Sequence, residues 1–199
     1  MTNRRDILRA AAVSAALPLM TGATSAVGAA QATRIALHAF LIDERYSACL
    51  SVGARLSGRG AAIHTIPEGD VTQVWLQSIG PAWRREPVAV AGLTARPALF
   101  CLEQLALSCG LRVVFHAEHV IHAEGPTGHS ILRGAGAANL SALDLRRAGP
   151  LWPARLADAI ATHRESALEP QRVGPSDAAL EPALPPDAQL LTSWIIAAA

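Results

Sequence analysis

The stretch 88–117, VAVAGLTARPALFCLEQLALSCGLRVVFHA, decides the expected fold. It opens with a run at 88–93 that is dense in apolar residues, as in a strand covered on both faces. Apolar residues then recur at helical spacing from Thr94, the expected N-cap, to Gly110, with Pro97 in a first turn that tolerates proline. A second apolar run closes the stretch. This order predicts two parallel strands joined by a crossover helix.

The same alternation occurs upstream of this stretch. Apolar runs at 34–42 and 61–66 predict two more strands, and the segment 45–57 has one apolar helical face. A further helix is expected from Asp70, as its cap, to the Gly80-Pro81 pair, which should end it. Strands and helices that alternate over short links predict an α/β fold with a mainly parallel three-layer sheet of the order βαβαβαβ.

The pattern changes after the fourth strand. The segment 120–134, VIHAEGPTGHSILRG, predicts an added hairpin, because two extended arms flank a Gly-Pro-Thr-Gly turn. A short helix is expected over 153–163, followed by a proline-rich strap at about 165–188 on the surface. The apolar run at 190–197 predicts a C-terminal strand docked on a sheet edge. We expect residues 33–199 to form a single domain.

The first 32 residues have the organisation of a secretory signal. Arg4 and Arg5 precede an apolar run from Ala10 to about Ala29, and small residues follow. A charged start, an apolar middle and a small-residue region predict a signal peptide that is cleaved near Ala30 or Ala32.

Residues 3–9, NRRDILR, resemble the twin-arginine (Tat) export motif of bacterial proteins. Arg4 and Arg5 match the paired arginines, and Ile7 and Leu8 match the large apolar pair. The resemblance covers about the first 30 residues, and the remainder resembles no family that we can name. The resemblance to the Tat motif implies a protein that folds in the cytoplasm, crosses the membrane through the Tat translocase and works in the periplasm with no stable membrane span. An ordinary secretory signal and an uncleaved anchor are the alternatives.

Composition excludes several chemistries. The proposed leader carries three arginines and one aspartate, so its removal changes the formal net charge from +1 to about −1. A chain with no net field has no electrostatic case for binding nucleic acid or an anionic membrane. The sequence contains no lysine, which excludes Schiff-base chemistry, lysine-linked pyridoxal phosphate and a Walker phosphate loop.

The cysteines are odd in number, at 49, 101 and 109. Cys101 and Cys109 fall on one expected helix, where eight residues span about 12 Å, too far for a bond between them. Either cysteine could pair with Cys49. Apolar neighbours and folding in a reducing cytoplasm favour free thiols.

Candidate acid–base groups lie where two expected strands end. Asp43 and Glu44 follow the first strand, and Glu68 and Asp70 follow the second. Ligands of open parallel sheets bind beyond the carboxyl ends of the strands. These carboxylates therefore form an acidic rim that a small enzyme could use, and they are also explained as helix caps and solvated residues.

The third strand ends on a candidate anion site. Gly92 and Thr94 are expected in a turn at a helix start, and Arg96 adds a guanidinium group in the first turn. A helix N-terminus and a guanidinium both favour an anion. A tight turn, an N-cap and a solvated arginine account for the same residues without a ligand.

A histidine cluster marks the expected hairpin. On an extended strand His116 and His122 share one face with Glu118 and Glu124, while His119 points to the other face, and the turn would bring His129 opposite His122. His116, His122 and His129 are therefore candidate ligands for zinc or copper. A solvated hairpin is the alternative.

Three functions fit this sequence. We expect most an accessory or escort subunit of a larger exported oxidoreductase, because the chain is small, has no cofactor motif and resembles Tat cargo. A periplasmic module that binds a metal or a small anion is the first alternative. A small enzyme that uses the acidic rim is the second, so the sequence leaves open whether the chain is an enzyme.

Overall fold

The computed structural model describes residues 36–134, 139–163 and 187–198. The proposed leader, with Arg4, Arg5, Ile7, Leu8 and the cleavage region, lies outside the described residues, as does nearly all of the expected strap. No helix of the described part is long and apolar enough to cross a membrane.

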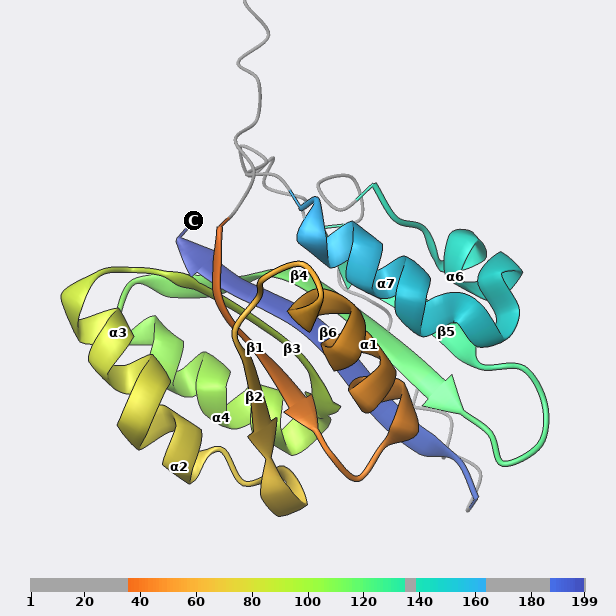
Figure 1. Cartoon of the computed structure of the whole chain (residues 1–199), viewed down its shortest axis with the longest axis horizontal. Helices are drawn as coiled ribbons and strands as arrows, with labels where there is room; N and C mark the ends of the chain where they lie inside the picture. Colours follow the sequence, from red (N-terminus) through yellow and green to blue (C-terminus); the bar gives the residue numbers. More distant parts are fainter. Residues whose placement is uncertain (1–35, 135–138, 164–186, 199) are drawn as a thin grey trace, which may run out of the picture. The chain divides into compact units, whose positions relative to one another are not determined.

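The described residues build a six-stranded mixed sheet with the strand order β2-β1-β3-β6-β4-β5 (Figure 1). The strands are β1 (Leu37–Asp43), β2 (Ile63–Ile66), β3 (Ala89–Ala95), β4 (Leu111–Ile121), β5 (Gly128–Arg133) and β6 (Gln189–Ala198). β1 pairs in parallel with β2 and β3, whereas β6 pairs antiparallel with both β3 and β4. β4 therefore runs in the same direction as β3, and β5 returns antiparallel to it.

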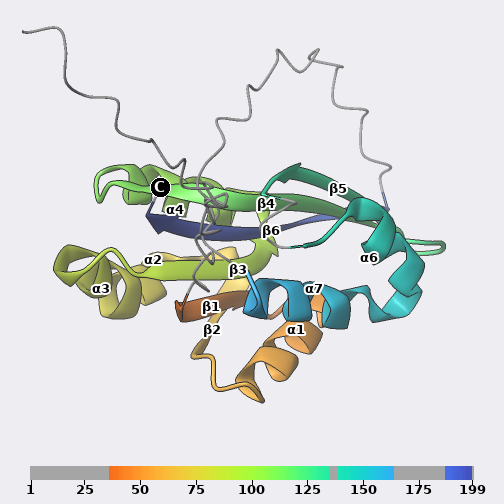
Figure 2. The same ribbon diagram turned by 90° about the horizontal axis from the view of Figure 1, so that it is seen from above.

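Helices cover both faces of this sheet (Figure 2). They are α1 (Ser47–Ser57), α2 (Thr72–Val74), the π-helical turn η2 (Trp75–Ile79), α3 (Gly80–Arg85), α4 (Arg96–Leu107), α6 (Ala142–Ala148) and α7 (Trp152–Ala161), with short 3-10 turns η1 (Pro67–Gly69) and η3 (Gly149–Leu151). One apolar cluster joins α1 and α7 to the sheet, with Phe40 and Phe115 at its centre. The second joins α2, α3 and α4 to the opposite face around Trp194.

The expected α/β class is confirmed at this level, but the sheet is mixed rather than mainly parallel. The C-terminal strand, expected on an edge, lies in the middle of the sheet between β3 and β4. Every residue from Leu191 to Ala197 is buried. A strand that is apolar on both faces loses most contact with water when neighbours lie on both sides, which explains the central position.

The helix expected to stop at Gly80-Pro81 continues to Arg85. The chain passes this pair through the π-helical turn, in which Gly80 N donates to Trp75 O, five residues earlier. A Cβ atom added at Gly80 would lie 2.8 Å from Trp75 O, so glycine is needed there. Pro81 then occupies the first turn of α3, where a missing N–H costs little.

Trp194 of β6 fits against β3 because Gly92 has no side chain. The two residues are paired across the strands. A Cβ atom added at Gly92 would lie 2.7 Å from Trp194 Cε2 and 3.1 Å from Leu41 O. Trp194 Nε1 also donates to Thr94 Oγ1 at 3.1 Å. The indole is thus held both by close packing and by a buried hydrogen bond.

A β-bulge in β4 exchanges the two faces of that strand. The register with β6 shifts between Val113 and Phe115. Val113 packs in the cluster with α4, whereas Phe115 and Ala117 pack in the cluster with α7. Beyond the bulge, side chains at even positions therefore face the α4 side of the sheet.

We expect Gly92→Ala to lower the free energy of unfolding by about 1–3 kcal/mol, because the new methyl group would overlap the indole of Trp194. Gly128→Ala is the matched control in β5, where the added atom would meet its nearest neighbour at 3.6 Å. Urea unfolding of both variants checks the difference. Equal effects of the two substitutions would contradict the packing argument.

Candidate functional site

Asp43, at the carboxyl end of β1, is held in an ion pair. Its side chain is fully buried, and Arg45 donates to both carboxylate oxygens, from Nε at 2.9 Å and from Nη2 at 2.6 Å. A Cβ atom added at Gly69 would lie 2.6 Å from Arg45 Nη2, so η1 packs closely on the pair. Through these contacts, Asp43 holds the end of β1 close to the loop that follows β2.

The other three residues of the acidic rim are exposed. Asp70 Oδ1 accepts a hydrogen bond from Thr72 N at 2.8 Å, and hydrogen bonding with Thr72 holds the pKa of Asp70 below its ordinary value. A carboxyl group with a lowered pKa is a poor general acid at neutral pH. Glu44 and Glu68 lie at the same edge, and the geometry assigns neither a partner in acid–base chemistry.

The anion candidates do not form the expected turn. Gly92 and Thr94 lie inside β3, and Ala95 precedes the first residue of α4 without a side-chain cap. The expectation that Thr94 caps the helix is wrong, because its hydroxyl donates to Ala95 O at 3.1 Å and accepts from the indole of Trp194. Arg96 is the first residue of α4 and is exposed, as expected.

The three histidines proposed as metal ligands are not brought together. The strand register places His129 opposite His119, whereas it was expected opposite His122. His119 and His129 face α7, while His116 faces the α4 side because of the bulge. Among the described residues, no group of three or more histidine, cysteine or acidic side chains has a geometry that could hold a metal ion. The zinc or copper expectation gains no support.

A buried histidine pair takes the place of the expected cluster. His119 Nδ1 lies 2.9 Å from His129 Nδ1, and His119 Nε2 lies 2.8 Å from Ser193 Oγ. The imidazole of His119 stacks on Trp152 of α7 with ring centroids 4.7 Å apart. One of the two Nδ1 atoms must carry a proton and donate the hydrogen bond, and the other must be unprotonated and accept it. The two neutral imidazoles are therefore in different tautomers.

Burial keeps both imidazoles neutral. It lowers the pKa of His119 to about 3, with a smaller effect of His129, and lowers the pKa of His129 to about 4, with a smaller effect of Arg146. The sequence pattern predicted that His119 points away from His116. It gave no sign of Ser193 as a partner, because that contact joins residues 74 positions apart.

The cysteines are free thiols in three different environments. Cys49 is buried and its thiol donates to Leu93 O at 3.1 Å. Burial raises the pKa of Cys49 to about 12, which makes it unreactive. Cys101 is exposed on α4, and Cys109 is partly exposed. The expectation of free thiols is therefore met within the chain.

The outward side of α4 is apolar. Phe100 and Leu107 lie seven residues apart on one side of the helix, and they are 61% and 52% exposed. We call this surface the α4 outer face; it consists of Pro97, Phe100, Cys101, Gln104 and Leu107. The two charged residues of α4 border this face: the exposed Arg96 lies four residues before Phe100, and the half-buried Glu103 lies three residues after Phe100 and four before Leu107.

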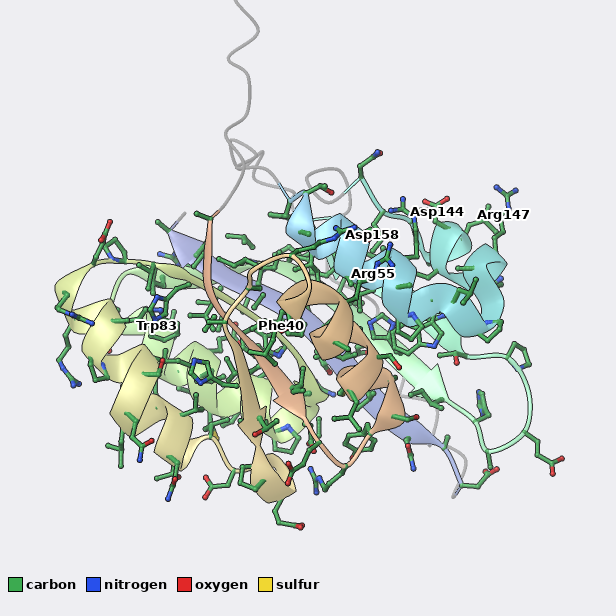
Figure 3. All side chains as sticks on the ribbon, viewed as in Figure 1. Phe40, Arg55, Trp83, Asp144, Arg147 and Asp158 are labelled. Atoms are coloured by element: carbon green, nitrogen blue, oxygen red, sulfur yellow. The ribbon has the colours of Figure 1, made fainter. Side chains whose placement is uncertain are left out.

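The helices on the opposite face of the sheet carry charges outward instead. Arg55 of α1 points toward Asp158 of α7 (Figure 3), with Nε 2.7 Å from Oδ1, and Arg59 also donates to this carboxylate. Hydrogen bonding with Arg55 lowers the pKa of Asp158. This surface is solvated in the ordinary way, whereas the α4 outer face is not.

The histidine pair predicts acid-sensitive stability. In the unfolded chain histidine has a pKa of about 6.5, so the unfolded state binds protons below that pH while the folded pair stays neutral. The free energy of unfolding should fall as the pH drops from about 6.5 toward 4, by up to about 1.4 kcal/mol per pH unit for each group.

Denaturant unfolding between pH 7.5 and pH 4 measures this slope. His119→Phe should make the slope shallower, even though the variant is less stable at every pH, and the buried His116 and His163, whose pKa values burial also lowers, should keep part of it. His38→Asn removes an exposed histidine and should leave the slope unchanged. A wild-type slope that survives His119→Phe would show that the pair is not its source.

Comparisons with known proteins do not identify the chain. No protein-family model, no curated protein and no solved structure matches the chain.

Proposed function

We propose that this chain is an accessory subunit that binds a larger exported protein, an oxidoreductase in the first instance, through the α4 outer face. The observation that carries the proposal is the exposure of Phe100 and Leu107 on one side of a helix whose other side is already buried. Large apolar side chains grouped on a surface mark sites of protein interaction.

The inner side of α4 accounts for its attachment to the sheet. Leu99 and Leu102 pack in the cluster with Trp194, and the small residues Ala98 and Ala106 let the helix approach closely. Large apolar residues on a second side of a helix indicate a second packing surface. The outer residues contribute nothing to this core, so we assign them to a partner.

The composition of the outer face favours a protein partner. Its five residues are uncharged, the bordering Arg96 and Glu103 have opposite charges, and the formal net charge of the chain is near zero both with and without the proposed leader. Nucleic acid and anionic membranes need positive charge, which this face lacks. An apolar protein surface of low charge complements it.

The twin-arginine resemblance supports a partner that is exported too. A chain that folds before transport has its α4 outer face assembled in the cytoplasm and can bind a companion there. We also propose that the Tat translocase exports the chain and that the chain functions in the periplasm.

Arg4→Lys together with Arg5→Lys should abolish export, because the proposed receptor recognises paired guanidinium groups, which a lysine pair does not reproduce. Fractionation of cells, with detection of the processed and unprocessed chain, measures the effect. The control Arg9→Lys changes a nearby arginine in the same leader and keeps the pair. Normal secretion of the double variant would remove export from the proposal.

Cys101 allows a direct test of the α4 outer face, because its exposed thiol lies beside Phe100. In a Cys109→Ser background, a photo-crosslinker attached to Cys101 should capture one larger exported protein in stoichiometric amount. Phe100→Ser with Leu107→Gln should reduce capture by about tenfold or more and leave unfolding within about 0.5 kcal/mol, since both side chains are exposed.

Leu151→Gln is the matched control, because Leu151 is 69% exposed but lies in η3, away from α4. Capture should survive this substitution. A crosslink to a second copy of this chain, or capture that the α4 variants leave intact, would contradict the proposal. Mass spectrometry of the crosslinked peptides distinguishes these results.

A further inference from the structure

We infer that the N-terminus of α4, together with Thr192 of β6, binds a protonated oxyanion, hydrogen phosphate. This site is separate from the α4 outer face and does not depend on the partner proposed above. We call its residues the α4 N-terminal cluster: Arg96, His116, Glu118 and Thr192.

The sheet register brings these residues together. Thr192 pairs with Thr94 on one side and with Glu118 on the other, and α4 begins two residues after Thr94. Trp194, two residues along β6, lies in the same apolar cluster as Leu99 and Leu102 of α4. Because alternate residues of a strand share a face, Thr192 points to the side of the sheet that α4 covers.

Thr192 is a buried polar group without a partner. The residue is fully buried, and its Oγ1 atom forms no hydrogen bond. His116, on the neighbouring strand β4 and the same face, likewise has a buried Nε2 atom without a partner. An unpaired buried polar atom costs free energy, and an oxyanion could accept a hydrogen bond from both side chains.

The helix start supplies the attraction for an anion. α4 is twelve residues long, and its N-cap Ala95 has no side chain that could accept from the first-turn N–H groups. The helix dipole adds positive potential there, and so does the guanidinium of Arg96, which lies near enough to His116 to lower its pKa. Burial is the main cause of the lowered pKa of His116, and Glu103 opposes the shift while Arg96 and Arg133 add to it, so the imidazole is neutral at neutral pH.

Glu118 decides which oxyanion fits. Its carboxylate is half-buried beside Thr192 and would repel an anion that has no proton. Hydrogen phosphate carries an O–H group that can donate to a carboxylate, whereas sulfate at neutral pH carries none. The charges that act on His116 are those of Glu103, Arg96 and Arg133, so with Glu118 the cluster and its surroundings hold two cations and two carboxylates.

The test uses the full chain without a partner and measures phosphate binding at pH 7 by calorimetry and by the shift in melting temperature. Phosphate should bind at least about tenfold more tightly than sulfate at matched ionic strength, with chloride as the reference salt. Thr192→Val should weaken phosphate binding by about tenfold or more. It should not destabilise the free protein, because it replaces an unpaired hydroxyl with a methyl group of the same shape.

Two further variants separate this site from general effects of salt. Glu118→Gln should abolish the preference for phosphate over sulfate, because an amide no longer repels the unprotonated anion. Thr65→Val, at an exposed position of β2, should leave phosphate binding unchanged. The inference is overturned if phosphate binds no better than chloride, if Thr192→Val binds it as tightly as the wild type, or if sulfate binds equally well.

Discussion

The close approach of Trp194 to Gly92 is the constraint on which the sheet depends. β3 and β4 do not pair with each other, so β6 alone joins the half formed by β1, β2 and β3 to the half formed by β4 and β5. β6 can lie against β3 because Gly92 leaves room for the indole of Trp194. Thr94, two residues further along β3, accepts a hydrogen bond from this indole. The C-terminal strand β6 thus connects the two halves of the sheet.

Local pattern predicted the elements well and their arrangement less well. The strands and helices between residues 37 and 121 follow apolar periodicity, which acts over a few residues, and most were placed within a few positions. The position of β6 depends on pairs formed with residues about 100 positions earlier, such as Thr94 with Trp194. The apolar run of β6, interrupted only by Thr192 and Ser193, predicted a strand, but the prediction of an edge position was wrong because the strand lies between β3 and β4. The π-helical turn before Pro81 had no comparable signal.

The candidate sites show the same division. Alternation along β4 placed His116 and His119 on opposite faces, which holds because the bulge at Val114 precedes both residues. The partner of His129 depended on the hairpin register, and the turn sequence alone suggested the wrong one. Gly92 and Thr94 have the residue types of a turn and a helix cap. They act instead in the packing of an indole that the chain supplies a hundred residues later.

The apolar surface of α4 is not explained by the fold. Polar residues at 100 and 107 would leave the contacts of Leu99 and Leu102 with the core unchanged, because the two sets lie on opposite sides of the helix. Other exposed leucines, such as Leu132 and Leu143, stand singly on different elements, and isolated apolar residues are common on protein surfaces. Phe100 and Leu107 differ because they share one face of the same helix, bordered by Arg96 and Glu103. Stability of the isolated chain gives no reason for such a face, whereas burial against another protein does.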